Sequence, residues 1–447
     1  ARHLINMGAR VKVFFTGEAE RLGDAARAMH DALHAMGVEI RPLVSERDWD
    51  RLRVSLRFAD GVVDGLLGTG VHGELREPTV RLVEEINAAG KPVMAIDIPS
   101  GVEADTGRIS SAAVHAERTL ALGLPKVGHL IGAGANAAGE LLVDDIGIPH
   151  ALLDGEELRQ SLITREAAAK LLPARARDVH KGSCGRILVV AGSLGMTGAA
   201  ALAAEAALRI GAGLVTLAVP EKLYPVLAAK LTEVMVVPVP DDGSGYFGGL
   251  KALETALSLA ANADAVLIGP GLGRAPETSE FVRLFAADVK APLVMDADAI
   301  YAFRGTLDAL RELPQVPILT PHLGEFAGLL GKTTDEVAGD LLNMARAAAK
   351  EHQAVFVVKS ACTIVVYPDG DAFFTTVGNA GMATAGTGDV LAGAIAGLMR
   401  QMESGMTPLV GVYAHGRAGD LAYEAHGNGL LAGDILRLLP QALGELG

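Results

Sequence analysis

The segment 378–399, GNAGMATAGTGDVLAGAIAGLM, joins a glycine-rich loop to an apolar helix. Glycines let a backbone approach a phosphate closely, and the free amides at the start of a helix point at it with a favourable dipole. Asp389 falls in the first turn of that helix, where a carboxylate beside an anion hole could serve as a base in phosphoryl transfer to a hydroxyl. In the alternative interpretation, the loop is an ordinary turn and Asp389 only stabilises the helix dipole.

Short apolar strands alternate with helices around this segment. The Ala-rich helix 199–210 follows the first of these strands, and the last two strands pair across the turn Pro368-Asp369-Gly370. Strands of this kind, separated by helices, indicate a parallel sheet covered on both faces. We therefore expect one large α/β domain over residues 158–447. Its strands are predicted at 186–191, 214–219, 233–237, 265–268, 293–296, 318–320, 355–359, 363–367 and 373–376.

Five glycine-rich or polar segments directly follow predicted strands, at the sheet edge where open α/β proteins bind ligands. Each has an ordinary explanation by itself: a strand-exit turn, a lone structural histidine or a solvated lysine. Asp296 and Asp298 alternate along the chain, so we expect only one of them to face a site. Five such signals at the strand ends of one domain favour a ligand site there. The segments are 192–193, 269–273, 296–298, 320–325 and 359–360.

The first part of the chain repeats the alternation on a smaller scale. Helices are expected over 20–36 and 78–89, and the pattern loses its strands around 150–165, so we place the end of the first α/β domain at residue 157. Strands are predicted at 11–15, 38–43, 61–67, 92–98, 120–122 and 141–144.

Asp64 and Asp97 each lie at the end of an apolar strand of this first domain. Two carboxylates on neighbouring strand ends could hold a cation or move a proton, or each could cap the helix after it. Lys126 follows a third strand and either joins them or lies on the surface.

Composition narrows the function classes. Lys and Arg total 39 and Asp and Glu 53, a net charge of −14, which argues against general binding to nucleic acid or anionic membranes. No run of about 20 uncharged apolar residues and no secretory signal occurs, so we expect no membrane span and a cytoplasmic location. Two cysteines, Cys184 and Cys362, leave no disulfide framework or zinc quartet.

Taken together, several of these motifs resemble those of the bifunctional NAD(P)H-hydrate repair enzymes. In that family an NAD(P)H-hydrate epimerase domain is fused to an ADP-dependent dehydratase domain. The resemblance implies a Rossmann-like N-terminal domain and a larger ribokinase-like C-terminal domain. The motifs are His180-Lys181-Gly182, Ala191-Gly192-Ser193, 269–273, 320–325 and 379–393.

The resemblance also implies the reaction. A phosphate moves from ADP or ATP, with Mg²⁺, to the hydroxyl at C6 of the hydrated nicotinamide ring of NADH hydrate or NADPH hydrate. Its elimination from the (S)-hydrate gives NAD(P)H, AMP and phosphate. The first domain interconverts the R and S hydrates and binds K⁺. We expect a homo-oligomer, since acidic, Ala-rich α/β chains of this kind often assemble.

Residue roles follow from the resemblance. Asp389 is the base of the dehydratase, and Asp97, with Lys126 as a weaker candidate, is the acid/base of the epimerase. Potassium would be bound by Asp64 and Ser100. Expected nucleotide contacts are Lys359, Ser360, Ala361, Cys362, Thr363, Asn379, Ala380, Gly381, Met382, Ala383, Thr384, Ala385, Gly386, Thr387 and Gly388. Expected substrate contacts are Gly68, Thr69, Gly70, Val71, His72, Gly73, Glu74, Asp97, Gly271, Gly273, His322, Leu323, Gly324, Glu325, Phe326, Ala327, Gly328 and Asp389.

The chain departs from the family pattern at three places. The family loop Asn-Asn-Gly-Gly-Asp-Gly, which supplies phosphate-binding amides and a potassium ligand, precedes the part that matches Ala1–Leu4, so we expect an upstream segment. Ser360 stands where the family has Gly, and Leu323 where it has Pro.

Two alternatives stay open. The second domain could be a ribokinase-like kinase of a small alcohol, as the Gly-Thr-Gly-Asp loop also allows. The first domain could be only a nucleotide-binding or oligomerising module.

Overall fold

The computed structural model describes residues 1–447 except 18, 154, 156–157 and 176–177. The chain divides into two compact units, Ala1–Leu153 and Asp154–Gly447, and each is described by itself. Within the described ranges, no helix combines the length and the hydropathy that crossing a membrane demands.

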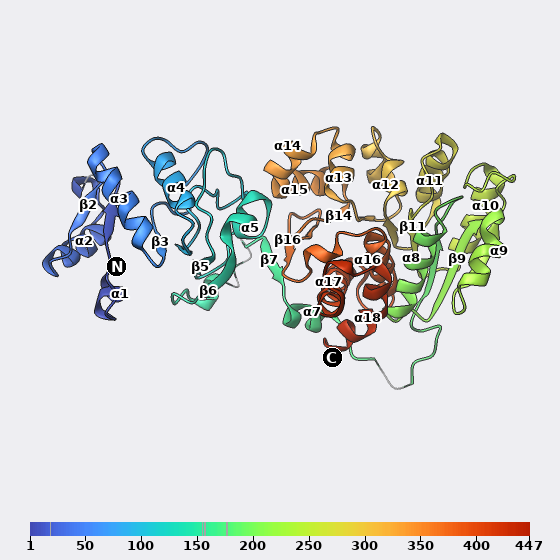
Figure 1. Cartoon of the computed structure of the whole chain (residues 1–447). Coiled ribbons are helices and arrows are strands. Elements are labelled where there is room, and N and C mark those ends of the chain that lie inside the picture. The colour runs from blue at the N-terminus through green and yellow to red at the C-terminus, as the bar shows by residue number, and fades with distance from the viewer. Residues whose placement is uncertain (18, 154, 156–157, 176–177) are drawn as a thin grey trace. The chain divides into compact units, whose positions relative to one another are not determined.

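A ten-stranded sheet forms the centre of the second unit (Figure 1), in the order β10-β9-β8-β11-β12-β13-β14-β15-β16-β7. Neighbouring strands are parallel except at β14–β15 and β15–β16, and the β15–β16 pair is the predicted late hairpin. The strands are β7 Gln160–Ile163, β8 Arg186–Val190, β9 Leu214–Pro220, β10 Met235–Val239, β11 Ala265–Ile268, β12 Leu293–Met295, β13 Ile318–Leu319, β14 Val355–Val358, β15 Ile364–Val366 and β16 Ala372–Thr375.

Strand β7 corrects the expectation that residues 150–165 lack strands. It pairs in parallel with β16, with Gln160 opposite Ala372 and Ile163 opposite Thr375. Only Ile163 of its four residues is buried, because β7 lies at the edge of the sheet. A single buried position gives no alternation that sequence could reveal.

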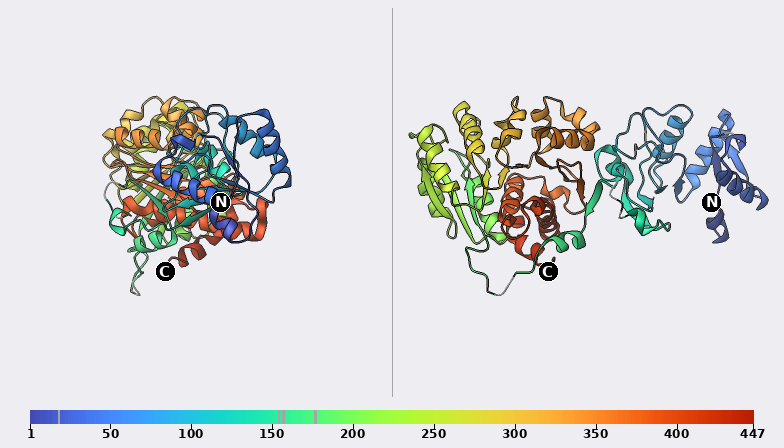
Figure 2. Two further views of the ribbon diagram at one scale, coloured as in Figure 1. Left: turned by 90° about the vertical axis from the view of Figure 1, so that its left-hand side faces the viewer. Right: turned by 180° about the vertical axis from the view of Figure 1, so that it is seen from behind.

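Helices cover both faces of this sheet, as Figures 1 and 2 show. Alternating strands and helices form such a three-layer arrangement because a parallel sheet must bury both faces. One face carries α8 Thr197–Arg209, α16 Thr387–Leu398, α17 Thr407–His426 and α18 Ala432–Gly444. The remaining helices of the unit are α7 Arg165–Leu171, α9 Tyr224–Lys230, α10 Leu250–Ala260, α11 Pro276–Asp288, α12 Asp298–Tyr301, α13 Leu323–Leu330, α14 Thr334–Gly339 and α15 Leu341–His352.

Small residues bring α16 against α8. A side chain at Gly393 would collide with the carbonyl oxygen of Ala203, and one at Gly397 with Ile210. Ala203 and Ala207 of α8 are fully buried in the same contact. Two helix backbones can approach this closely only where side chains are small, so the packing fixes the position of the N-terminus of α16.

The first unit contains two separate parallel sheets, one of β1 and β2 and one in the order β3-β4-β5-β6. The strands are β1 Val13–Phe15, β2 Ile40–Pro42, β3 Val62–Asp64, β4 Val93–Ile96, β5 Arg118–Leu122 and β6 Glu140–Asp144. The helices are α1 Arg2–Asn6, α2 Asp24–Ala35, α3 Glu46–Phe58, α4 Thr79–Ala88, α5 Gly132–Ala138 and α6 His150–Leu153.

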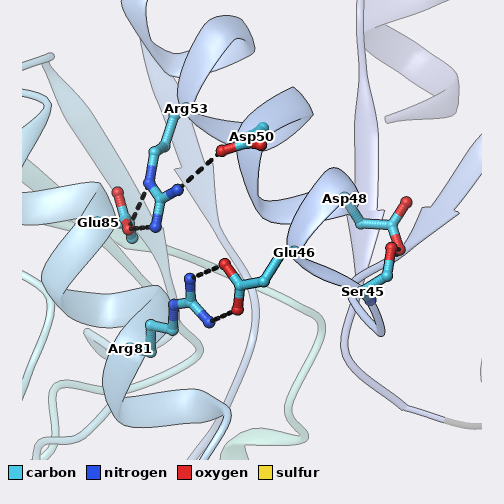
Figure 3. Close-up of polar contacts among 7 residues, drawn as sticks. All are labelled: Ser45, Glu46, Asp48, Asp50, Arg53, Arg81 and Glu85. Carbon is cyan, nitrogen blue, oxygen red and sulfur yellow. Dashed lines mark hydrogen bonds and ion pairs between the residues drawn. The ribbon is translucent and has the colours of Figure 1, made fainter.

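Helix α3 is an element that the sequence analysis missed, and polar contacts join it to α4 (Figure 3). The two terminal nitrogens of the Arg81 guanidinium, Nη1 and Nη2, each donate to Glu46 at 2.7 Å, and Arg53 Nε donates to Glu85 at 2.8 Å. Arg81 also lies 4.3 Å from the ring centroid of the buried Trp49. The many charges of α3 obscure an apolar face that Trp49, Leu52 and Leu56 nevertheless form at helical spacing.

Candidate active sites

The glycine-rich loop of the second unit ends at the N-terminus of α16. Gly386 precedes the helix with φ 93°, a left-handed conformation that favours glycine. The first amides of an α-helix have no partner inside it, so those of 386–388 are available to a ligand. The Thr387 hydroxyl donates to the carbonyl oxygens of Met382 at 3.2 Å and Thr384 at 3.1 Å, which fixes this turn from within.

Two polar residues of α17, Asp420 and His415, form hydrogen bonds to the loop and to the first turn of α16. The sequence analysis found neither of them. The Asp420 carboxylate accepts hydrogen bonds from the Gly378 amide at 3.1 Å and from Asn379 Nδ2 at 2.9 Å. His415 Nε2 lies 2.9 Å from the Thr387 carbonyl oxygen, and burial lowers the pKa of His415 to about 4. A neutral ring bonds a carbonyl only as a donor, so its proton is on Nε2. No local signal could have found them, because α17 has several other polar residues, such as Arg417 and Glu424.

A lysine and an aspartate meet beside the start of α16. Lys359 Nζ donates to Asp296 Oδ1 at 2.9 Å, and Thr320 Oγ1 donates to the same oxygen at 2.7 Å. A Cβ atom at Gly388 would lie 3.0 Å from Lys359 Nζ, so the ammonium lies against the helix N-terminus. Burial acts to lower the pKa of Lys359, but Asp296 and Glu325 outweigh it and the pKa is raised. Lys359 is therefore a fixed positive charge at this edge of the sheet.

Asp389 lies among these charges. Burial, together with the charge of Asp296, raises the pKa of Asp389 to about 7, and Lys359 opposes part of this rise. A carboxylate whose pKa lies near neutrality can both take up and release a proton at physiological pH, as a general base requires. The structure thus brings together Asp389, Lys359 and the Gly388 backbone, which the sequence analysis had placed in one site.

Asp298 approaches the same region, which corrects one expectation. Its carboxylate accepts hydrogen bonds from the Gly273 amide at 2.8 Å and from Arg274 Nε at 2.9 Å. Its charge also raises the pKa of Asp389, as that of Asp296 does. Asp296 and Asp298 therefore both face the site, although the sequence predicted that only one of them would. The reason is Ala297, whose φ of 48° breaks the alternation of an extended strand.

His322 caps α13 beside Lys359. Its Nδ1 accepts the amides of Gly324 at 3.0 Å and Glu325 at 3.2 Å, while Glu325 Oε2 accepts the His322 amide at 2.9 Å. His322 and Lys359 form a parallel bridge, so this capping box adjoins the lysine. With Nδ1 occupied as an acceptor, the Nε2 atom of the imidazole lies 3.5 Å from Glu325 Oε1, so the ring is held on both sides.

Three residues of the predicted binding sets are instead packing residues. Phe326 is fully buried with its ring 5.3 Å from that of Phe356, and Ala327 is also buried. Both face the core because they lie on the inner side of α13. Cys362 is buried, its thiol lies 3.2 Å from the Thr375 carbonyl oxygen, and burial raises its pKa to about 12. It stays a protonated thiol, and neighbouring Ser360 and Ala361 are exposed.

In the first unit, Asp97 and Lys126 are brought together. Lys126 Nζ donates to Asp97 Oδ1 and, at 3.0 Å, to the Leu122 carbonyl oxygen. Asp97 has φ 68°, a conformation uncommon outside glycine, and its Oδ1 also accepts the Leu122 amide at 3.0 Å. His129, a residue that the sequence analysis missed, is buried behind the pair, and its Nδ1 accepts the Lys126 amide at 3.0 Å. Strained backbone beside an ion pair is typical of functional sites.

Asp64 and Ser100 bind one another. Asp64 Oδ2 accepts the Ser100 amide at 2.8 Å, and Oδ1 accepts the Ser100 hydroxyl at 2.7 Å and the Leu66 amide at 3.2 Å. The Ser100 oxygen in turn accepts the Leu67 amide at 2.9 Å. These bonds fix the two side chains against one another, and Asp64 Oδ2 and the Ser100 oxygen each keep one lone pair that is free of the hydrogen bonds described. The potassium site stays a prediction.

The loop 68–74 follows directly and is held by Glu103. Glu103 Oε1 accepts the Gly73 amide at 3.0 Å, and Thr106, Arg108 and Ser110 donate to the same carboxylate. Thr69, Gly70, His72 and Glu74 are exposed, whereas Val71 packs inward. The anchored loop therefore presents its polar groups to solvent.

Comparison with known proteins assigns both units. A family model described as NAD(P)H-hydrate dehydratase matches residues 187–441, and one described as YjeF-related protein N-terminus matches residues 1–128. A bifunctional NAD(P)H-hydrate repair enzyme Nnr from Moorella thermoacetica is 41% identical over all of this chain and 84% of its own length. Its counterpart in Thermofilum pendens is 38% identical over the same shares.

The chain belongs to the bifunctional NAD(P)H-hydrate repair enzyme family. Among solved structures, the ADP/ATP-dependent NAD(P)H-hydrate dehydratase of Bacillus subtilis, co-crystallised with ATP/Mg²⁺, is 29% identical with a TM-score of 0.56. It covers 65% of this chain and all of its own. A ribokinase-like superfamily protein from Enterococcus faecalis is 26% identical with a TM-score of 0.55, and covers 66% of this chain and 99% of its own. The predicted ribokinase-like fold of the second domain is confirmed.

The perturbed carboxylate of this repair-enzyme site predicts an unusual pH dependence of stability. Between the ordinary pKa of 3.8 and about 7, folded Asp389 keeps a proton that the unfolded chain has released, so its contribution to stability falls as pH rises. We expect Asp389→Asn to exceed wild type in free energy of unfolding by roughly 1–4 kcal/mol above pH 7, and by nothing below about pH 4.

Urea denaturation followed by circular dichroism at pH values between these limits measures the difference. Glu254→Gln, which removes an exposed carboxylate on α10, is the matched control and should show no such trend. Two results would contradict the burial of an ionised Asp389. One is an equal free energy of unfolding for Asp389→Asn and wild type at every pH, and the other is a difference between them that grows as pH falls.

Proposed function

We propose that the second unit dehydrates the (S)-hydrate of NADH or NADPH at the expense of ADP or ATP, and that the first unit interconverts the R and S hydrates. The observation that carries this proposal is the placement of Asp389, with a pKa raised to about 7, beside the N-terminus of α16 and the Lys359 ammonium. A base, an amide cradle and a fixed cation are the three groups that phosphoryl transfer to a hydroxyl needs.

The first step activates the substrate hydroxyl. Asp389 takes the proton of the hydroxyl at C6, whose oxygen attacks the terminal phosphorus of the nucleotide. A new P–O bond forms as the bond to the leaving nucleotide oxygen breaks, which converts ADP to AMP. The amides of 386–388 donate to the equatorial phosphoryl oxygens, and Lys359 stabilises the charge that develops on them.

The second step releases phosphate. Hydroxide leaves carbon poorly, whereas phosphate leaves well, so the C6–O bond breaks with its electron pair going to phosphate. The departing phosphate accepts the proton from C5, whose C–H electron pair forms the ring double bond and restores NAD(P)H. The chain needs no further oxidant or reductant, since hydrate and product differ only by water.

Magnesium fits this arrangement as a companion of the nucleotide. Magnesium usually keeps several waters and is held by phosphates plus one or two carboxylates. Asp296 and Glu325, the carboxylates that interact most strongly with Lys359, would supply these ligands. When bound, the ion would neutralise phosphate charge. Among the described residues, the one group of three potential metal ligands is Asp308, Glu351 and His352, which belong to another part of the unit.

In the first unit, Asp97 and Lys126 are the pair that we propose to move the proton during epimerisation. The ion pair places an acid and a base side by side, and His129 fixes the Lys126 backbone behind them. The anchored loop 68–74 is the proposed substrate contact. Homo-oligomerisation and potassium binding stay predictions.

The dehydratase proposal is tested by incubating the protein with NADH hydrate and ADP or ATP and following absorbance at 340 nm. We expect Asp389→Asn to reduce turnover by about 10²–10⁴-fold, the usual contribution of a general base, while nucleotide affinity changes little. Wild-type turnover should rise with pH through about 7, as Asp389 loses its proton. Glu254→Gln should behave as wild type. Retained turnover in Asp389→Asn would remove this residue from the mechanism, and stable phosphorylation of another alcohol would favour a kinase.

The epimerase proposal is tested with (R)-NADH hydrate as the starting material, resolved from the S form by chromatography. We expect Asp97→Asn to lower the rate of interconversion at least about tenfold, because the proton-transferring pair is lost. Dehydration of the S hydrate by the second unit should be unaffected. Asp60→Asn, which changes an exposed carboxylate of the same unit, is the control. Interconversion absent from wild type would favour a binding or oligomerising module instead.

A further inference from the structure

A cavity of about 520 Å³ adjoins the candidate dehydratase site. Its lining includes Gly273, Arg274 and Asp298, together with the side chains of Met196 and Tyr246. Asp298 connects the cavity to the chemistry, since the charge of its carboxylate also raises the pKa of Asp389. The cavity therefore lies at the loop after β11, whose residues Gly273 and Arg274 line it and bond the Asp298 carboxylate.

Two arginines from separate elements converge at this rim on one aromatic ring. The guanidinium carbon of Arg274 lies 4.9 Å from the ring centroid of Tyr301, and so does that of Arg304. The two carbons are therefore no farther apart than twice this distance. Arg304 also lies against Gly328 of α13, where a Cβ atom would come within 2.5 Å of Arg304 Nη2. The loop after β11, the end of α12 and the turn that follows α12 thus form a single cationic cluster, defined as Arg274, Tyr301 and Arg304.

The cluster has more positive than negative charge. Arg274 pairs with Asp298 at 2.9 Å, but among the residues that the structure describes Arg304 makes no ion pair. A chain of net charge −14 has abundant carboxylates to neutralise an arginine, yet the guanidinium of Arg304 packs on the ring of Tyr301. Two like charges on one ring repel each other, and an anion between them would relieve the repulsion. Guanidinium groups bind phosphate oxygens in a bidentate manner.

We propose that Arg274 and Arg304 bind a phosphate group of the dinucleotide hydrate, with Tyr301 as the platform that orients both side chains. This inference rests on the proposed function, because it assigns a subsite to that substrate. Both hydrates have a pyrophosphate, and only NADPH hydrate has a further phosphate on its adenosine ribose. Either phosphate has the chemistry that the cluster recognises, and the two can be separated experimentally.

The test measures binding of the products NADH and NADPH to the whole chain by fluorescence titration, which needs no turnover. Arg274→Gln and Arg304→Gln should each raise the dissociation constant roughly tenfold, the loss expected for a charge-assisted hydrogen bond. Arg209→Gln, which removes an exposed arginine from the last turn of α8, is the matched control and should bind as wild type. Arg304→Lys should recover part of the lost affinity, because lysine keeps the positive charge but not the planar guanidinium that binds a phosphate through two nitrogens.

The two ligands identify which phosphate is bound. Weaker binding of both NADH and NADPH assigns the pyrophosphate, and weaker binding of NADPH alone assigns the ribose phosphate. In turnover assays the same variants should raise KM while kcat changes less than about threefold. Added salt should reduce the difference in KM between wild type and variants, because it screens the charge of the arginines. A dissociation constant unchanged in both arginine variants for both ligands overturns the inference, as does absence of binding to wild type.

Failure of the inference and failure of the proposed function give different results. A wild-type protein that binds NADPH through the cluster but never restores NADH from its hydrate contradicts the function alone. A wild-type protein that restores NADH, with both arginine variants unaffected in KM, contradicts the subsite alone. Circular dichroism of each variant confirms that the fold is retained, so that lost binding is assigned to the side chain.

Discussion

The buried ion pair between Lys359 and Asp296 is the interaction on which the second unit's chemistry depends. Taking two charges out of water is costly, so such a pair is weak evidence for stability by itself. Here it places an ammonium against the N-terminus of α16, where it interacts with three carboxylates, those of Asp296, Glu325 and Asp389. The ammonium opposes the rise that burial and the neighbouring carboxylates impose on the pKa of Asp389. With it, the pKa of Asp389 lies near the value at which a base is useful.

Local sequence was sufficient to find the part of this site that lies on one continuous segment. The glycines before α16 and the position of Asp389 in its first turn follow from loop and helix chemistry, and the structure places them as expected. Strand-end positions for Lys359 and His322 followed from the predicted alternation of strands and helices. The family resemblance added roles that the residues alone left open.

What the sequence could not provide depends on contacts between distant segments. Asp420 and His415 hold the loop from α17, and no local pattern connects them to residues so far back along the chain. The positive φ of Ala297 interrupts the strand alternation from which we expected only one of Asp296 and Asp298 to face the site. Burial of Phe326 and Ala327 depends on which side of α13 faces the sheet, and β7 depends on pairing with a strand 212 residues further along the chain. The missed helix α3 is different, since its apolar face was present in the sequence but outnumbered by charges.

A crystal structure of Asp389→Asn with Mg²⁺ and a non-hydrolysable nucleotide analogue tests the central claim most directly. We expect the terminal phosphate oxygens within about 2.7–3.1 Å of the amides of 386–388, with Lys359 Nζ close by and the side chain at position 389 facing the phosphorus. A nucleotide bound elsewhere on the sheet, or a side chain at position 389 turned into apolar packing, would contradict it.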